Sequence, residues 1–229
     1  MEMETVKYLQ ILTEEIHSVV VATLNEEGRP ETRVIDMMLY DEQGLYFLTA
    51  RGKSFYRQLM QQGYVSLSGT KAKRAVRVDG KVRNIGHKKL AEIFAHNPYM
   101  GKIYPGDTCE VLEVFQLYEG TGEFFDISNP AHIERGSFVI GKAAEVATGY
   151  QVSKACIGCR RCLSVCPQAC ITMGENDCAH IEGSHCLGCG RCAEVCPVQA
   201  IHRPIRRCQS QERSRDSDVA PRTRENKRW

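Results

Sequence analysis

The 229-residue sequence predicts a mainly β fold, an antiparallel β-barrel with accessory helices, followed by a small metal-stapled domain. Two observations carry this prediction. Short β-branched segments separated by tight turns fill much of residues 1–141, and eleven of the twelve cysteines fall between Cys156 and Cys208. The first region is long enough to build an apolar core, whereas the second is too short and too rich in cysteine to be stable without cross-links or metal.

The first part of the chain alternates between predicted strands and turns. Apolar residues at Val6, Leu9 and Leu12 suit a short amphipathic helix over residues 1–12. Gly28 and Gly44 close two tight turns, and Gly63 ends a helix. The elements expected around these glycines are strands at 19–24, 32–40 and 45–49 and a helix at 53–62.

The pattern then returns to strands. Asn97 and Pro98 end a helix that we expect to begin at His87. Gly120 and Gly122 suggest a turn over residues 119–122 that joins two strands as a hairpin. The strands expected in this region are 64–68, 75–82, 108–118 and 123–127. Six or so antiparallel strands can close as a barrel, which removes exposed sheet edges.

The predicted organisation has four parts. They are a barrel domain over residues 1–141, a linker over 142–154, a cysteine-rich domain over 155–205 and a basic tail over 206–229. The stretch from Arg203 to Trp229 is poor in large apolar residues, so we expect disorder there. Its arginines are not interleaved with aromatic residues, which argues against nucleic acid as a partner.

The cysteine-rich region contains the same sequence motif twice. Each copy reads C-x2-C-x2-C-x3-C-P, the spacing of thiolates that hold iron–sulfur clusters. The first copy has Cys156, Cys159, Cys162 and Cys166, and the second has Cys186, Cys189, Cys192 and Cys196. Disulfides would need an oxidising compartment, and the start of the chain does not read as a secretory signal. A zinc site needs only four ligands and does not account for the duplication.

These motifs resemble the bacterial two-cluster ferredoxin over residues 150–205, a small α+β domain. The resemblance implies two [4Fe-4S] clusters whose ligands cross between the repeats. One set is Cys156, Cys159, Cys162 and Cys196, and the other is Cys186, Cys189, Cys192 and Cys166. Of the cysteines outside the motifs, Cys170 is expected to be a small buried hydrophobe. We expect His185 to be a solvated loop residue.

A candidate phosphate site lies in the barrel region. A predicted strand ends at Thr49 and runs through a basic loop containing Lys53 and Ser54 into the helix that carries Arg57. Cations, hydroxyls and a helix N-terminus together suit a phosphate group. The plainer interpretation is a helix start that Ser54 caps. We find no G-x-G-x-x-G phrase, which argues against the standard dinucleotide fold.

The order of segments 28–36 and 49–59 resembles the pyridoxamine 5′-phosphate oxidase-like, FMN-binding split-barrel family over residues 5–130. The resemblance implies a split barrel, a homodimer and FMN. The FMN contacts that it implies are Arg33, Val34, Ile35, Thr49, Lys53 and Ser54. The Trp- and Arg-rich substrate region of the vitamin B6 oxidase has no counterpart here, and oxygen-sensitive clusters suit an oxidase poorly. We therefore do not expect pyridoxamine phosphate oxidation.

The main hypothesis is an FMN-dependent oxidoreductase that couples two-electron flavin chemistry to single-electron steps through the clusters. An alternative is a non-catalytic electron-transfer subunit, and a third is a barrel that binds haem or a deazaflavin. His87, His96 and Tyr99 are acid–base candidates by type only, so the catalytic residues are unknown. Without a signal or an apolar stretch that could span a bilayer, we expect a soluble cytoplasmic protein with a small-molecule or protein redox partner.

Overall fold

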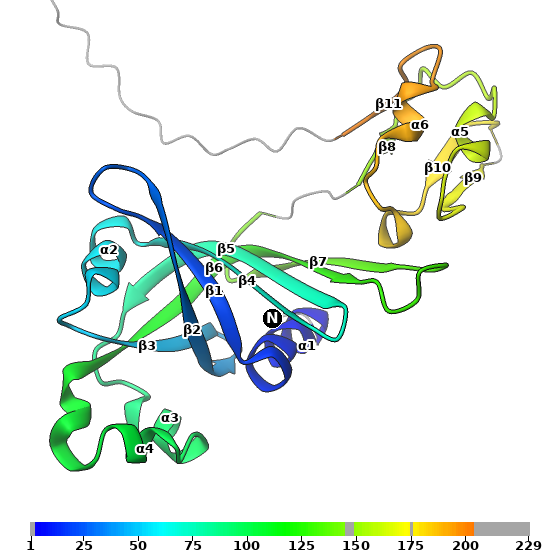
Figure 1. Cartoon of the computed structure of the whole chain (residues 1–229). Coiled ribbons are helices and arrows are strands. Elements are labelled where there is room, and N and C mark those ends of the chain that lie inside the picture. The colour runs from blue at the N-terminus through cyan, green and yellow to red at the C-terminus, as the bar shows by residue number, and fades with distance from the viewer. Residues whose placement is uncertain (1–2, 145–148, 175, 204–229) are drawn as a thin grey trace, which may run out of the picture.

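A computed structural model describes residues 3–144, 149–174 and 176–203. Its larger part is an antiparallel sheet in the strand order β3-β2-β1-β4-β5-β6-β7 (Figure 1). Strand β3 also pairs with β6, which closes β1 to β6 into the predicted barrel. The strands are β1 (Ser18–Leu24), β2 (Pro30–Asp41), β3 (Gly44–Ala50), β4 (Tyr64–Lys71), β5 (Arg74–Asn84), β6 (Leu112–Asp126) and β7 (Glu134–Ile140).

Accessory helices precede the first strand of the barrel and connect later ones. Helix α1 (Met3–Gln10) continues into a π-helical turn, Ile11–Ile16, before β1 begins. Helix α2 (Ser54–Gln62) ends at Gly63, whose φ of 59° is the left-handed conformation that favours glycine. Between β5 and β6 lie α3 (Leu90–His96), α4 (Met100–Ile103) and a 3-10 turn, Gly106–Val111. Helix α3 begins three residues later than His87, where a turn precedes it.

The burial of each strand follows its place in the barrel. In β1 the side chains alternate between exposed and buried, with Val19 and Val21 in the barrel interior. In β3 six consecutive residues are buried. Leu45 and Phe47 belong to the barrel core, whereas Tyr46 and Leu48 belong to an outer cluster with Ile93 of α3. The continuous apolar run in β3 therefore reflects burial on both faces.

The predicted hairpin around residues 119–122 is wrong, because β6 runs unbroken from Leu112 to Asp126. Its glycines mark close approach between strands. A Cβ atom on Gly120 would lie 2.6 Å from the carbonyl oxygen of Asp79 and 2.9 Å from Cα of Gly80. At Gly122 the ring of Phe138 from β7 occupies the space that a side chain would need. Glycine inside this strand therefore allows close packing and does not mark a turn. Strand β7 was not predicted.

The cysteine-rich domain repeats its elements at an interval of thirty residues. Helix α5 (Arg161–Ser164) corresponds to α6 (Arg191–Glu194), and β9 (Ile171–Met173) corresponds to β11 (Ile201–His202). Strand β9 pairs with β10 (Ala179–Ile181), and β11 pairs with β8 (Gln151–Val152). Strand β8 lies in the segment predicted as a linker, residues 145–148 of which are outside the described part. The predicted tail, 206–229, is outside it too.

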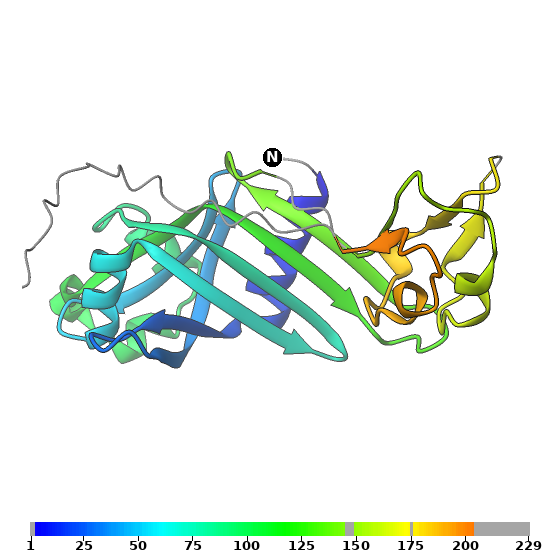
Figure 2. The ribbon, with the colours of Figure 1, turned by 90° about the horizontal axis from the view of Figure 1, so that it is seen from above.

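Strands β6 and β7 extend from the barrel toward the cysteine-rich domain in both views (Figures 1 and 2). The connection between them contacts that domain through backbone groups. Gln168 accepts a hydrogen bond from the Ile133 N–H at 3.1 Å and donates one to the Pro130 carbonyl at 3.1 Å. Arg135 of β7 reaches the carbonyl of Cys186 at 3.4 Å. Within the described ranges, none of the helices has the length and apolar character needed to cross a bilayer.

We expect Gly120→Ala to lower the free energy of unfolding of the barrel by roughly 1–3 kcal/mol, because the added methyl group meets the backbone of β5. Urea unfolding followed by circular dichroism measures this loss. Gly101→Ala is the matched control, since a Cβ atom there meets nothing within 4 Å among the described residues. Equal stabilities for the two variants would contradict the packing role of Gly120.

Candidate functional site

The eight motif cysteines surround two cavities, each with about 330 Å³ of space that is partly open to solvent. Each cavity takes three cysteines from one repeat and the last cysteine from the other. The first cavity is lined by Cys156, Cys159, Cys162 and Cys196, and the second by Cys186, Cys189, Cys192 and Cys166. The structure therefore gathers the cysteines in the two crossed sets that the ferredoxin resemblance implies.

The donors around these cavities fit an iron–sulfur cluster. Four motif cysteines line each, and the remaining lining is largely apolar, as with Ile171 and Ile181 at the second cavity. Backbone N–H groups also point at sulfur, from Gly188 to Cys186 at 3.3 Å and from Ala200 to Cys196 at 3.2 Å. Such N–H donors stabilise the negative charge of a ligating thiolate.

Burial sets the protonation of several of these thiols. It raises the pKa of Cys162 and of Cys192, so both are neutral until a metal displaces their protons. At Cys156, hydrogen bonds from the backbone of Ala179 and Gly158 lower the pKa. Cys178 also lies within hydrogen-bonding reach of Cys156.

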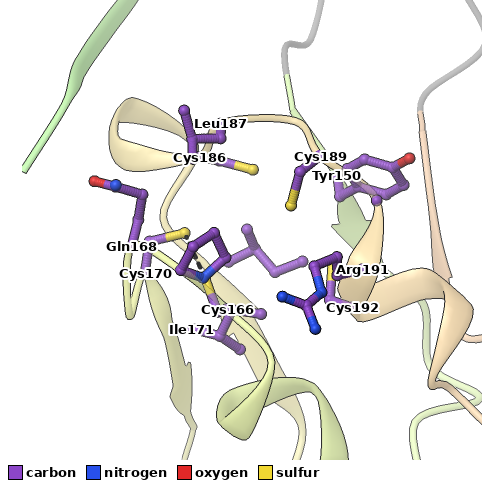
Figure 3. Close-up of a pocket in the computed structure, with 13 residues that line it drawn as sticks. Tyr150, Cys166, Gln168, Cys170, Ile171, Cys186, Leu187, Cys189, Arg191 and Cys192 are labelled. Atoms are coloured by element: carbon purple, nitrogen blue, oxygen red, sulfur yellow. Dashed lines mark hydrogen bonds between the residues drawn. The ribbon is translucent and has the colours of Figure 1, made fainter. Parts of the chain in front are cut away.

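Cys170 is a fifth cysteine at the second cavity (Figure 3). It is buried, as expected, but it is also in polar contact, because its Sγ lies 3.5 Å from Sγ of Cys166. Burial raises the pKa of this thiol to about 12. Sequence reasoning missed this contact, since Cys170 lies outside the repeated spacing.

The solvated-loop expectation for His185 is wrong. Its Nδ1 lies 2.8 Å from the Ile133 carbonyl, and its ring lies 3.8 Å from that of His132, centroid to centroid. His185 therefore belongs to the contact between the barrel and the second-cavity loop.

The candidate phosphate site lies at the start of α2, at the end of the barrel remote from the cysteine-rich domain (Figures 1 and 2). Lys53 occupies the N-cap and Ser54 the first helical position, so the alternative interpretation, in which Ser54 caps the helix, is wrong. No side chain in the described part of the chain caps α2. The first backbone N–H groups of α2 therefore lack a side-chain acceptor there, and Lys53, Ser54 and Arg57 beside them are all exposed. The arrangement suits an anion such as a phosphate.

Thr49 is separated from this exposed group. Its side chain is 2% exposed, and its hydroxyl has no hydrogen-bond partner among the described residues. The structure thus places Lys53 and Ser54 together at the surface, and it places the Thr49 hydroxyl in the interior at the end of β3.

Arg33 points into a partly buried polar group beneath α2. Its guanidinium donates to the hydroxyl of Thr23 and, at 2.9 Å, to Oε1 of Gln58, and it lies 4.5 Å from the ring centroid of Phe55. Glu31 pairs with it at 3.5 Å. These contacts join β2 to the inward face of α2. Arg33 therefore fixes the helix that presents Lys53 and Ser54.

The two residues after Arg33 have different surroundings. Val34 is 66% exposed, whereas Ile35 packs against the barrel core. Because neighbouring residues of a strand face opposite sides, Val34 alone of the two is open to a ligand or a partner.

The sequence did not reveal the residues that hold α2 against the barrel. Gln58 and Thr23 hold Arg33, and Glu113 of β6 accepts hydrogen bonds from Tyr56 and Asn84. The hydrogen bonds from Asn84 and Tyr56 lower the pKa of Glu113. The sequence gives one indication of this group, because Gln58 lies on the same face of the predicted helix as the apolar residues Phe55 and Leu59.

The acid–base candidates do not converge. Nε2 of His87 lies 3.3 Å from the Glu110 carbonyl, and Nδ1 of His96 lies 2.9 Å from the Glu92 carbonyl at the end of α3. Tyr99 is 69% exposed. These contacts are typical of turn and helix-end residues.

For the cavities, we expect Cys196→Ala to abolish the cluster in the first cavity and to leave the cluster in the second, so that about half of the iron is lost. Alkylation with iodoacetamide and mass spectrometry measures which thiols become reactive. Cys156, Cys159 and Cys162 should react, and Cys186, Cys189 and Cys192 should stay protected. Cys166→Ala is the matched variant and should give the reverse. Reaction confined to the mutated motif would rule out the crossed sets.

For the barrel, we expect Arg33→Ala to lower the free energy of unfolding by about 2 kcal/mol, because it leaves Thr23 and Gln58 without their charged partner. Urea unfolding of the protein without added ligand measures this. Arg29→Ala, on the preceding turn with a side chain 78% exposed, should change stability by less than about 0.5 kcal/mol. If Arg33→Ala left the stability of the ligand-free protein intact, its role in holding α2 would be disproved.

Comparison with known proteins agrees with both halves of the structure. Residues 6–119 match the pyridoxamine 5′-phosphate oxidase family, and residues 155–200 match the 4Fe-4S dicluster domain. The pyridoxine/pyridoxamine 5′-phosphate oxidase of Mannheimia succiniciproducens is 35% identical over 85 residues, which are 36% of this chain and 40% of that enzyme. The Streptomyces avermitilis enzyme is 36% identical over 107 residues, 46% and 48% of the two chains.

This chain spans less than half the length of either enzyme. A solved structure, that of a NimC/NimA family protein from Clostridium acetobutylicum, is 21% identical with a TM-score of 0.50, over 58% of this chain and 92% of that one. Its likeness shows the fold, a split barrel. The chain therefore carries a split-barrel domain that matches the pyridoxamine 5′-phosphate oxidase family, followed by a domain that matches the 4Fe-4S dicluster family, and the pair supports electron transfer in general.

Proposed function

We propose that this protein is an FMN-dependent oxidoreductase that couples two-electron chemistry at the flavin to one-electron transfer through two [4Fe-4S] clusters. The observation that carries the proposal is the pair of four-cysteine cavities in one chain with a split barrel. The uncapped, cationic start of α2 in that barrel supports a phosphate-bearing cofactor.

In the cysteine-rich domain the eight motif cysteines would hold the clusters, four at each cavity. The clusters supply single-electron transfer when they are bound. The chain's own part is to provide thiolates and to stabilise their charge. The N–H groups of Gly188 and Ala200, which already point at ligand sulfurs, serve this purpose.

In the barrel, Lys53, Ser54 and the first N–H groups of α2 would hold the FMN phosphate, with Arg57 as a further cation. FMN supplies a junction between two-electron and one-electron chemistry. Arg33 keeps α2 in place through Gln58, so it acts on this site through the helix. The exposed side chain of Val34 is open to the rest of the cofactor or to a second chain.

The proposal includes a homodimer in a reducing cytoplasm. Val20 of β1 and Val34 of β2 are paired neighbours in the sheet and are 45% and 66% exposed, which supports a second chain against this face. Within one chain, α2 lies at the opposite end of the barrel from the cysteine-rich domain (Figure 2). A second chain could bring its cysteine-rich domain to the flavin end.

A second candidate is an electron-transfer subunit whose substrate site lies on another protein. One observation favours it. The match to the oxidase family ends at residue 119, less than half of the Mannheimia and Streptomyces enzymes is matched, and β7 and the cysteine-rich domain follow the matched part of this chain. In this version the flavin and the clusters only relay electrons.

Anaerobic purification, followed by assays of iron, sulfide and released flavin, tests the proposal. We expect iron and sulfide for two clusters and FMN in the same preparation. Reduced nicotinamides or small electrophiles should then change the flavin spectrum, and the cluster absorption should follow. Flavin that responds only when a partner protein is added would favour the subunit. Haem or a deazaflavin in place of FMN would overturn the flavin assignment.

We expect Lys53→Ala to weaken FMN binding about 10- to 100-fold, because a charge-assisted hydrogen bond to the phosphate is lost. Its affinity for riboflavin, which lacks the phosphate, should change little. Quenching of flavin fluorescence on titration measures both affinities. Lys88→Ala, another exposed lysine in the barrel domain, is the control. An equal effect of Lys53→Ala on riboflavin and FMN would argue against a phosphate contact.

A further inference from the structure

Cys170 lies on the turn between α5 and β9, four residues after the cavity cysteine Cys166. It is 8% exposed and lines the second cavity. Its Sγ lies 3.5 Å from that of Cys166, and Figure 3 shows this contact beside the open space of the cavity. The proposed cluster ligands do not include it.

The duplication supplies an internal comparison. Thirty residues after Cys170 the second repeat has Ala200, which is fully buried. The backbone N–H of Ala200 donates to Sγ of Cys196, the cysteine that corresponds to Cys166. An alanine therefore satisfies the packing at this place in the fold. In the first repeat, the thiol of Cys170 is a polar group beside the crossing cysteine, Cys166.

We propose that Cys170 is a positioning residue that donates its S–H to the Cys166 thiolate and thereby raises the reduction potential of the cluster in the second cavity. The inference rests on the proposed function, since it needs that cluster to be bound. A cysteine that ligates no iron keeps its proton, and an S–H group can donate. Reduction adds one negative charge to the cluster and its ligands, so a donor at a ligand sulfur favours the reduced form.

Cys178 has a different place at the first cavity. It lies near Cys156, but its own S–H group has the carbonyl oxygen of Ala179 as an acceptor, 3.7 Å from its Sγ. It does not line the first cavity among the described residues. Of these two cysteines, Cys170 alone both contacts a proposed ligand sulfur and lines the cavity.

The test is a redox titration of the full chain with dithionite, monitored by electron paramagnetic resonance under anaerobic conditions. In Cys170→Ala we expect one cluster to become harder to reduce, with its reduced-to-oxidised ratio at a fixed potential falling about three- to tenfold. The other cluster should be unchanged. Cys170→Ser keeps a donor and should restore part of the shift. Cys109→Ala, a cysteine of the barrel domain, should have no effect.

The Cys196→Ala background assigns the shift, because only the second-cavity cluster should remain in it. Iron content must stay the same when Cys170→Ala is added, as the alanine of the second repeat leads us to expect. An unchanged potential with full iron content would overturn the role of Cys170 and leave the proposed function standing. That role would also be overturned if Cys170→Ala in the otherwise unchanged chain lost the iron of one cluster, since Cys170 would then be a ligand. A wild-type protein without iron would instead overturn the proposed function.

Discussion

Strand β6 is the element on which both halves of this molecule depend, because its hydrogen bonds reach three other strands. Its first residues, Leu112 to Leu117, pair with β3 and close the barrel. Most of its length pairs with β5, and its last part, from Gly120 to Asp126, pairs with β7. Gly120 and Gly122 let β6 continue past the closing segment, where the backbone of β5 and the ring of Phe138 come close.

The same strand sets where the cysteine-rich domain contacts the barrel. The β6–β7 connection carries His132 and Ile133, and β7 carries Arg135, which is 15% exposed and reaches the loop of the second cavity. The barrel therefore contacts the surroundings of the second cavity, through Gln168 of the first repeat and through His185 and Cys186 of the second. Together with Cys170, these contacts make the surroundings of the two cavities unequal although their cysteine spacings are identical.

Much of the fold could be predicted from local patterns. Turns at Gly28, Gly44 and Gly63 and the β-branched runs around them placed the first strands and α2 within a few residues. Prediction failed where a residue type has two uses. Gly120 looks like a turn residue until β5 is seen against it, and Ser54 looks like a cap until the backbone places Lys53 there. The role of Arg33 as a ligand contact stays a prediction, and its partners within the protein, Thr23 and Gln58, could be found only from the tertiary structure.

The sequence by itself determined the chemistry that the C-terminal domain can support, because cysteine spacing is a local property and the repeat spells it out twice. It also determined the architecture of the barrel, since the alternation of apolar residues follows from which side of each strand is buried. Only the tertiary structure decided which cysteines share a cavity and that Cys170 contacts Cys166. It also decided that the Lys53 side chain is exposed whereas the Arg33 side chain is held by Thr23 and Gln58. These are matters of distance between residues far apart in the chain or outside any motif, and no local pattern records them.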